Sequence, residues 1–210
     1  MKRKTTKDIL AESFLELIND KRISKITIND ITSNCGMTPP TFYNYFKDKY
    51  DLIVWIYVRG VEPVISQIGD NEYKWRDILH CAASYYWDNK GFVVNALKHT
   101  SGHDSFLLLM QKINAEYIGK AVRTKIMTEH LPDEITGLIK VYVCGTISIL
   151  ADWLVGDNTL TLEHIVNIRD KSLPEALRHY QDEEEDMYWA EQQLELIEKI
   201  GLQNWLNHQI

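Results

Sequence analysis

Two helix signals and a glycine lie between Thr27 and Lys49, and this short segment constrains the fold more than any other part of the chain. Thr27 and Asp30 match a capping box, in which the hydroxyl accepts from the third helical amide and the carboxylate accepts from the threonine amide. Gly36 lies where that helix, about residues 28–35, must end, because glycine enters the left-handed conformation without a Cβ penalty. The segment therefore predicts a short helix followed by a tight turn.

A second short helix is predicted directly after the turn. Pro39 and Pro40 suit a first helical turn, where amide protons have no intrahelical acceptor. Because a residue before proline is disfavoured in the α region, we expect Pro40 to be the first helical residue. A helix, a glycine turn and a second helix form a helix-turn-helix, whose second helix lies in the major groove of DNA. A purely structural helical pair would show the same pattern and is the alternative.

The two predicted helices have one apolar and one polar face. The residues expected in a small core are Ile28, Ile31, Met37, Phe42 and Phe46. The residues left on the outer face carry hydroxyl, amide or phenol groups that can bond to phosphates or bases: Thr38, Thr41, Tyr43, Asn44 and Tyr45. The pattern is compatible with a DNA-reading face.

The segment TPPTFYNYFKDKYDLI resembles the TetR family of bacterial one-component regulators, whose signature T-x-Y-x-Y-F-K-x-K-x-x-L spans the recognition helix and the start of the next helix. The residues that carry the match are Thr41, Phe42, Tyr43, Tyr45, Phe46, Lys47, Lys49 and Leu52, with Gly36 upstream. The likeness covers about the first quarter of the chain. After Tyr57 it extends only to the family's plan, an all-helical ligand-binding and dimerisation domain. VYVCGTISILADWL, residues 141–154, also resembles a Gram-positive subgroup, some of which regulate dihydroxyacetone kinase operons.

The resemblance implies roles for residues of the predicted DNA-binding domain. Tyr43, Tyr45 and Lys49 are expected to hold phosphates. Thr38, Thr41 and Asn44 are expected at base edges, with Asn29 helping from the first helix. The full DNA-binding set that we expect is Thr27, Asn29, Thr38, Pro40, Thr41, Tyr43, Asn44, Tyr45 and Lys49.

Charge is distributed unevenly along a chain whose net charge is -7. Residues 1–49 hold nine Lys or Arg against six acids, whereas residues 182–210 hold eight acids and one lysine. Phosphate attraction is local, being screened over about 8 Å at physiological salt, so the positive N-terminal end matters more than the total. Lys2, Arg3 and Lys4 form a basic arm that is expected either to follow a DNA backbone or to be a solvated terminus.

The rest of the chain predicts an all-α protein of three parts. These are a helix-turn-helix domain over residues 1–50, a helical ligand-binding and dimerisation domain over residues 51–181, and an acidic, amphipathic extension over residues 182–210. Thr5 and Asp8 form another capping box, which starts a helix ending near Asn19. The helices expected after it are 48–67, 75–88, 92–99, 104–127, 133–154 and 162–180. The first of these joins the helix-turn-helix domain (the head) to the helical domain (the body). Pro63 is expected to kink this helix without preventing it.

The body is expected to enclose a small-molecule site, because ligand pockets are mostly apolar with a few placed polar groups. The candidates are Cys81, Tyr85, Met110, Asn114, Tyr117, Tyr142 and Thr146, and a well-filled core is the alternative. Neither a metal nor a cofactor is expected, since the three cysteines are widely spaced and His99 and His103 are separated by a predicted helix end. No enzyme motif is found, and no apolar run approaches the ~20 residues of a membrane span, so a cytoplasmic location is expected.

These features predict a homodimeric, ligand-responsive repressor that binds a near-palindromic operator in double-stranded DNA. The dimer is expected to form through the helices at residues 133–154 and 162–180, and a small molecule is expected to release the DNA. The alternative is an activator or a helical interaction module that takes its signal from a partner protein. Residues 182–210 are expected either to cover the body or to dock a partner.

Overall fold

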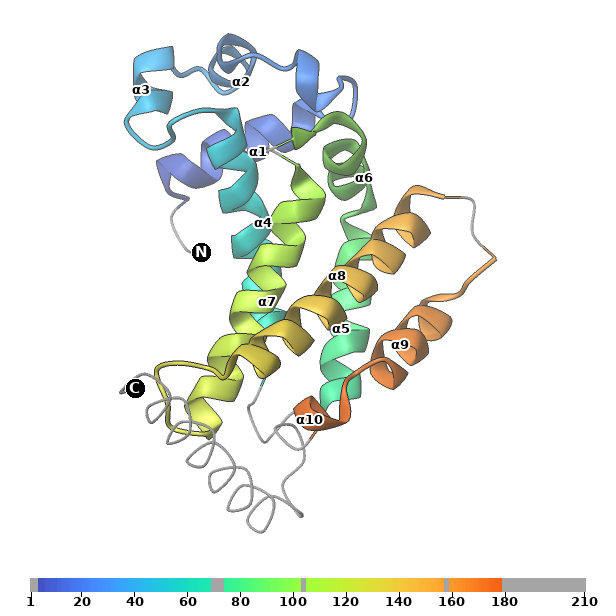
Figure 1. The fold of residues 1–210 in the computed structure, drawn as a ribbon. Coiled ribbons are helices and arrows are strands. Elements are labelled where there is room, and N and C mark those ends of the chain that lie inside the picture. Colours follow the sequence, from blue (N-terminus) through green and yellow to red (C-terminus); the bar gives the residue numbers. More distant parts are fainter. Residues whose placement is uncertain (1–3, 69–73, 103–104, 157–158, 179–210) are drawn as a thin grey trace.

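The computed structural model describes residues 4–68, 74–102, 105–156 and 159–178 of the 210 residues. Every regular element within these ranges is helical, which confirms the predicted all-α class. The molecule has a small head of short helices at one end and a body of longer helices below it (Figure 1). Residues 182–210, the predicted extension, lie outside the described residues.

The head consists of α1 (Thr6–Leu17), the 3-10 helix η1 (Ile23–Lys25), α2 (Ile28–Asn34) and α3 (Pro39–Tyr43). Both predicted capping boxes are present, at Thr5 with Asp8 and at Thr27 with Asp30. The head encloses an apolar core made of the fully or nearly fully buried side chains Leu10, Phe14, Ile23, Ile26, Ile31, Phe42 and Phe46. Local signals thus start the helices, and burial of these side chains packs them together.

The predicted start of the second reading helix is wrong by one residue, because α3 begins at Pro39 rather than Pro40. Thr38 is the extended residue, with φ -113° and ψ 152°, so it is the first proline that forces its predecessor out of the α region. Pro39 and Pro40 then occupy the first two helical positions, where neither ring removes a needed hydrogen bond.

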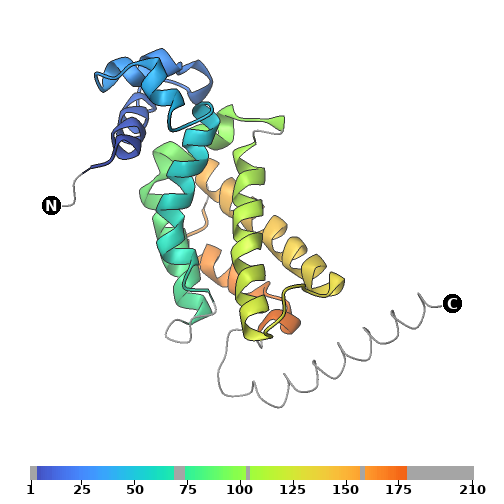
Figure 2. The ribbon, with the colours of Figure 1, turned by 90° about the vertical axis from the view of Figure 1, so that its left-hand side faces the viewer.

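The helix α4 (Lys49–Ile65) leaves the head and runs down into the body (Figures 1 and 2). Its N-cap is Asp48, whose carboxylate accepts from the amides of Tyr50 and Asp51. Pro63 lies inside the helix, near its end, as expected. Leu52 and Ile53 are buried near the head, and Tyr57, Val61 and Ile65 are buried in the body. One helix therefore packs in both parts, and the predicted domain boundary near residue 50 stays a prediction.

The body consists of α5 (Trp75–Asp88), α6 (Lys90–His99), α7 (Phe106–Lys125), α8 (Asp133–Val155), α9 (Leu162–Lys171) and α10 (Glu175–Arg178). In Figure 1 α7 runs beside α4, and α8 crosses α7 obliquely. On the other side α9 packs along α5.

The predicted last helix, residues 162–180, is interrupted in the structure. The helix α9 ends at Lys171, and α10 begins at Glu175, directly after Pro174. Proline lacks the amide proton of a helix interior, and its ring clashes with the preceding turn, so a continuous helix is broken there. Leu173 and Leu177 are nevertheless buried, which keeps both pieces against the body.

The helix α8 contradicts the prediction that no apolar run approaches the length of a membrane span. Its 23 residues, Asp133–Val155, make it the one helix among the described residues that is long and apolar enough to cross a membrane by length and composition. Half of its most apolar window is buried inside the protein, among side chains that include Ile139, Val143 and Leu150. A core helix passes the same test, and α8 packs as a core helix of the body.

Candidate nucleic-acid interface

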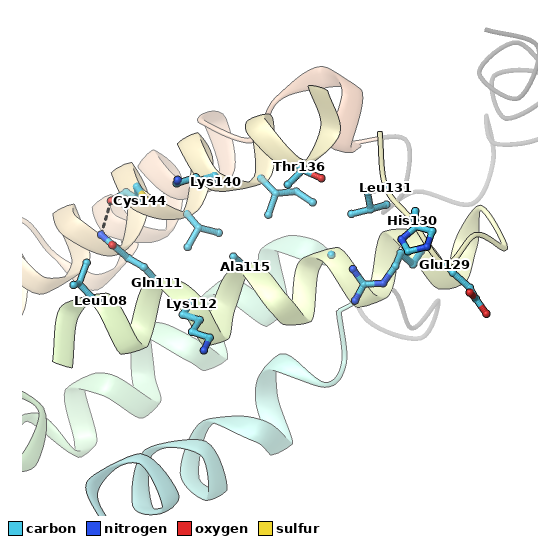
Figure 3. A pocket seen from close by; sticks show the side chains of 14 residues that line it. Leu108, Gln111, Lys112, Ala115, Glu129, His130, Leu131, Thr136, Lys140 and Cys144 are labelled. Carbon is cyan, nitrogen blue, oxygen red and sulfur yellow. Dashed lines mark hydrogen bonds between the residues drawn. The ribbon is translucent and has the colours of Figure 1, made fainter. Parts of the chain in front are cut away.

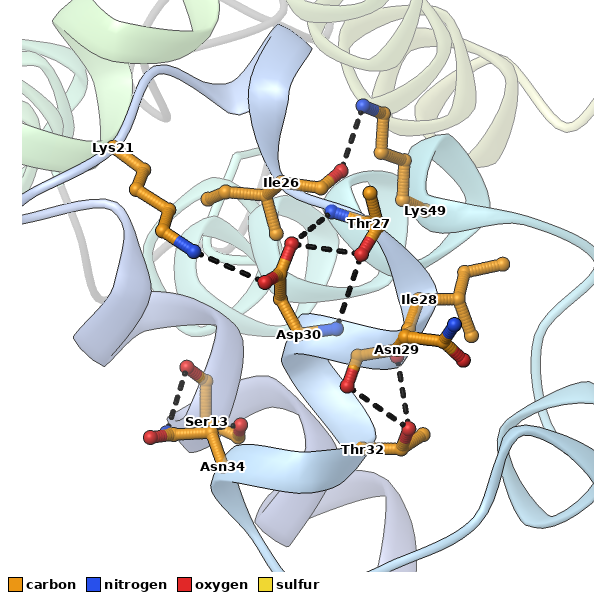
Figure 4. A network of polar contacts seen from close by, with 10 residues as sticks. All are labelled: Ser13, Lys21, Ile26, Thr27, Ile28, Asn29, Asp30, Thr32, Asn34 and Lys49. Carbon is orange, nitrogen blue, oxygen red and sulfur yellow. Dashed lines mark hydrogen bonds and ion pairs between the residues drawn. The ribbon is translucent and has the colours of Figure 1, made fainter.

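The start of α2 is fixed by a closed set of hydrogen bonds (Figure 4). The Thr27 amide donates to Asp30 Oδ2 over 2.8 Å, and the Asp30 amide donates to Thr27 Oγ1 over 3.1 Å. Lys21 Nζ lies 3.0 Å from Asp30 Oδ1. The hydrogen bonds from Thr27, followed by that from Lys21, hold the pKa of the Asp30 carboxyl well below its usual 3.8. Thr27, a predicted DNA contact, is thus engaged as a helix cap.

A second network joins α2 to α1 and uses residues that the sequence pattern did not single out. The Ser13 hydroxyl is buried and donates to the Ile31 carbonyl over 2.7 Å. The Asn34 amide donates to Ser13 Oγ over 3.1 Å and to Glu16 Oε2 over 2.9 Å. Figure 4 shows Ser13 and Asn34 facing each other between the two helices. These bonds hold the inner side of α2 against α1. The outer side of α2 is therefore free for other contacts.

The turn and α3 present the predicted polar face to solvent. Gly36 has φ +69°, the left-handed conformation expected of it. Tyr43 and Tyr45 are 57% and 42% exposed. Other predicted contacts at Asn29, Thr38, Pro40 and Asn44 are exposed, and Thr41 is half-buried with its hydroxyl 3.1 Å from that of Thr38.

Buried aromatic rings pack beneath the exposed face of α3. The Phe42 ring is fully buried, and its centroid lies 5.6 Å from that of Phe46 and 5.7 Å from that of Tyr43. The Phe46 ring in turn lies 5.9 Å from Trp55 of α4. Because buried rings hold α3 from beneath, its exposed side chains have a fixed position without taking part in the core. This is the arrangement expected of a recognition helix.

Lys49 has a geometry that differs from the predicted phosphate contact. Its ammonium donates to three carbonyl oxygens of the loop around η1, those of Ile23 (2.9 Å), Ser24 (3.2 Å) and Ile26 (3.0 Å). The bond to Ile26 is visible in Figure 4. Burial lowers the pKa of this ammonium from its usual 10.5. The side chain therefore ties the start of α4 to the head, and its role at phosphates stays a prediction.

Other basic residues lie on the surface of the head. Arg22, Lys25 and Lys47 are exposed and make no ion pair with any described residue. Lys4 instead lies 2.8 Å from Glu12 of α1. Lys2 and Arg3, the other members of the predicted basic arm, lie outside the described residues.

The head is also joined to the body by α6, a contact that sequence reasoning missed. The Asn95 side chain accepts from the Ile23 amide over 3.0 Å and donates to the carbonyls of Ile18 (3.1 Å) and Lys21 (3.0 Å). Asn95 follows Ile23 by 72 residues, so no local pattern could reveal this pairing. The connecting helix α4 and the body helix α6 thus both hold the segment that precedes α2.

The structure places the predicted effector residues in several environments. Asn114, Tyr142 and Thr146 are buried and line one common cavity between α5, α7, α8 and α9. That cavity has a volume of only ≈ 10 Å³, far below the roughly 300 to 1,000 Å³ of a drug-sized site. The expected ligand-sized interior site is therefore closed at these three residues.

The remaining four predicted effector residues do not share that cavity. Met110 is fully buried, and Cys81 is exposed. The Tyr85 ring packs against Gly60 of α4 so closely that a Cβ there would clash with the phenol. Tyr117 donates to Glu62 over 3.2 Å and borders a separate pocket of ≈ 250 Å³. The seven residues are thus not gathered around one site.

A buried hydrogen-bonded network connects α4 with α5 and α7. The hydroxyls of Tyr57 and Tyr86 lie 2.8 Å apart, and the Asn114 amide donates to the Tyr57 hydroxyl over 3.0 Å. Burial raises the pKa of both phenols. The network therefore ties the body interior to the helix that continues into the head.

A larger pocket lies at the surface, in the angle between α7 and α8 (Figure 3). Its volume is ≈ 590 Å³, and it includes none of the seven predicted effector residues. Gln111 of α7 reaches toward Cys144 of α8 and donates to its carbonyl over 3.4 Å, and Leu108, Lys112 and Lys140 also line the pocket. Among the described residues no group of three or more His, Cys, Asp or Glu side chains could hold a metal ion.

Residues 12–54 match the model of one protein family, the bacterial regulatory proteins of the tetR family. A curated relative is the HTH-type dhaKLM operon transcriptional activator DhaS of Lactococcus lactis subsp. lactis (strain IL1403), with 26% identity over 104 residues. The match covers 50% of this chain and 55% of the relative, so the chain spans about half the length of the curated relative.

Solved structures share the fold over most of the chain. The dihydroxyacetone kinase operon activator DhaS aligns with a TM-score of 0.55 and 20% identity, covering 80% of this chain and 96% of that one. A TetR transcriptional regulator from Streptococcus agalactiae 2603V aligns with a TM-score of 0.58 and 18% identity, covering 84% of this chain and 94% of that one. At such identities the likeness shows the fold alone.

The family match covers α2 and α3, and the structural likeness covers head and body together. The relatives are transcription regulators and not enzymes, in agreement with the prediction. Residues 12–54 are thus similar to the N-terminal domain of the tetR family of bacterial regulatory proteins, and they stand on a body that shares the helical fold of solved regulators.

Proposed function

We propose that the chain acts as a homodimer that reads a near-palindromic operator with α3. The observation that carries this proposal is the polar, exposed face of α3 above the buried rings of Phe42 and Phe46. Asn44 is the residue best suited to discriminate bases, because an asparagine amide can pair in bidentate fashion with adenine. Tyr43 and Tyr45 are large and exposed, and their phenols suit phosphate contacts.

We propose that the dimer forms mainly through α8. Val141 on this helix is 73% exposed, and Gly137 and Gly145, one turn to either side, have open space where a Cβ would be. An exposed valine between two glycines supports the close approach of a second helix. The helix α9 offers less, because Ile165 and Val166 are already buried. Its outer residues include Glu163, His164 and Lys171, which are exposed.

Sedimentation of matched variants tests this interface. Val141→Asp should convert the dimer to monomer at micromolar concentration, since it places a charge in the contact between the two α8 helices. Lys171→Glu, on the exposed side of α9, should leave the dimer intact. A dimer that resists Val141→Asp and dissociates with Lys171→Glu would move the interface to α9.

The way in which the body receives its signal is the second part of the proposal. The ≈ 10 Å³ cavity at the predicted site counts against release by an enclosed, drug-sized effector. The name of the relative DhaS counts in the same direction, since that protein is called an activator. We therefore favour an activator that takes its signal from a partner protein, or from a very small ligand, over the predicted repressor.

A transcription assay separates the activator from the repressor. Its reporter gene is placed under an operator obtained by selection of binding sites from random duplexes. The activator version predicts that deletion of the gene lowers expression, whereas the repressor version predicts that deletion raises it. The variant Asn44→Ala, at an exposed position, should change expression in the same direction as the deletion and by less. If the deletion raises expression, the predicted repressor is correct.

A further inference from the structure

Arg169 of α9 is buried in the body without a partner for most of its charged group. The side chain is 5% exposed, and its Nε and Nη1 atoms have no hydrogen-bond acceptor. Trp75 of α5 is 7% exposed, and its indole N–H makes no hydrogen bond, although it lies close enough to the Tyr142 phenol to offset part of the rise that burial causes in the pKa of that group. Arg169 and Trp75 both line the small cavity described above. Leaving buried donors unmatched is costly, so an unseen acceptor at this point would stabilise the fold.

The acidic residues nearest to Arg169 in the sequence pair with other arginines. Asp170 lies 3.9 Å from Arg76 and 3.8 Å from Arg178, and its carbonyl accepts from Arg178 over 2.6 Å. Glu163 pairs with Arg76 at the surface. No ion pair of Arg169 exists among the described residues, so its charge lacks a counter-ion there. An uncompensated buried charge is among the least favourable groups in a protein interior.

The chemistry of the walls selects the class of ligand. The guanidinium and the indole have only donors, and a guanidinium keeps its charge when it is buried. The polar neighbours Asn114, Tyr142 and Thr146 interrupt an otherwise apolar lining. The volume of ≈ 10 Å³ is close to that needed for one water-sized occupant. A single water would accept from the donors but would not balance the charge.

We propose that this cavity binds a small anionic group through Arg169 and Trp75. The occupant best fitted to so small a cavity is a halide ion; the carboxylate end of a small organic acid has the same acceptor chemistry but is larger, and the experiment below separates the two. Asn114, in the cavity wall, also donates to the Tyr57 hydroxyl on α4, so the occupant lies one residue away from the helix that enters the head. Its effect on DNA binding rests on the proposed function, whereas its binding does not.

Thermal unfolding of the full chain in bromide, formate or acetate, at constant ionic strength set by a bulky sulfonate, tests the binding. The unfolding midpoint should rise saturably, by roughly 5 °C at saturation, because a ligand that binds only the folded state stabilises it. A response to bromide alone assigns a halide, and a stronger response to formate or acetate assigns a carboxylate. Anomalous scattering from bromide-soaked crystals should place the ion beside Arg169.

Variants separate this site from general salt effects. Arg169→Met should abolish the anion dependence, whereas Arg76→Met, which removes a half-buried arginine from the same helix pair, should keep it. If Arg169→Met does not fold, Trp75→Phe replaces the indole by a smaller aromatic ring, removes one donor and should weaken the dependence about tenfold in concentration. An equal dependence in wild type and Arg169→Met, or crystals that show water only, would overturn the proposal.

Operator titrations with and without the probe anion test the coupling separately. A change in affinity of threefold or more that is lost in Asn114→Leu supports transmission through Tyr57. Anion binding with unchanged operator affinity would overturn that transmission and leave the binding site intact. Failure to bind any duplex would refute the proposed function, while the thermal and crystallographic results would still decide the anion site.

Discussion

The head and the body of this protein bury different kinds of polar group. In the head, Tyr43 at the end of α3 and Asn44 directly after it are exposed, and the buried polar side chains are the small hydroxyls of Ser13 and Thr32, which donate to backbone carbonyls. In the body, Asn114, Thr146 and Arg169 are buried between helices. An exposed polar group contributes little to stability and is available to DNA, whereas a buried one must be satisfied and fixes its neighbours. The exposed groups of the head are thus available to a partner, whereas the buried groups of the body tie neighbouring helices together.

The two regions meet at the segment before α2, and this junction explains how they can influence each other. Lys49 at the start of α4 and Asn95 on α6 both bond to the backbone around η1. A shift of either helix would therefore move the start of α2, and with it α3. Such a shift changes operator affinity only if the two states differ in their free energy of binding to DNA.

The largest difference should be found between a substitution in the core of the head and one on its exposed face. Phe42→Ala removes a fully buried ring and should lower the free energy of unfolding by about 3–5 kcal/mol. Tyr43→Ala, next to it but 57% exposed, should leave stability nearly unchanged and weaken DNA binding. Urea unfolding and duplex titration of both variants measure this difference. Equal losses of stability would show that the face belongs to the core.

Loss of Asn95 should have the next largest effect. Asn95→Ala leaves the Ile23 amide and the carbonyls of Ile18 and Lys21 without their partner, at a cost of about 1–3 kcal/mol. Limited proteolysis should then release the head from the body more readily. Asn89→Ala is the control, because its exposed side chain bonds only to the Tyr85 carbonyl at the end of its own helix. Equal protease sensitivity would exclude α6 as a support of the head.

The two regions should also differ in the pH range in which they lose stability. The folded-state pKa of Asp30 is below the usual 3.8, so its contribution is complete above about pH 4 and is lost as the pH falls further. Burial raises the pKa of Tyr142 to about 12 from the usual 10.0, so its contribution is complete below pH 10 and is lost between pH 10 and 12. Asp30→Asn should flatten only the acid limb of a stability profile, and Tyr142→Phe only the alkaline limb.

The smallest effects should distinguish the two lysines after α3. Lys47 is exposed, and Lys47→Ala should lessen the slope of log affinity against log salt by about one. Lys49→Ala should instead lower stability by about 1 kcal/mol, a value discounted for partial exposure, and leave the slope nearly unchanged. A slope that falls by one with Lys49→Ala would restore the phosphate contact predicted from the family signature.

Short-range signals in the sequence were sufficient for most of the head. The capping boxes at Thr5 and Thr27, and the turn at Gly36, involve residues three or four apart, so a linear reading finds them. The bonds of Asn95 and Lys49 join residues 23 to 77 apart, and nothing local indicates them. The seven predicted effector residues do not share one cavity, because apolar spacing shows which faces point inward and not how completely they fill the space between helices; the effector site itself stays a prediction.

Selection of binding sites from random duplexes, with the wild type and Asn44→Ala in parallel, tests most directly whether α3 reads DNA sequence. The wild type should enrich a near-palindrome with half-sites about 34–36 Å apart, one turn of the duplex. Asn44→Ala should enrich the same motif with discrimination lost at one base pair of each half-site, at a cost of about 1–3 kcal/mol there. An absence of enrichment by the wild type, or an unchanged motif with the variant, would contradict the reading of bases by Asn44 at the end of α3.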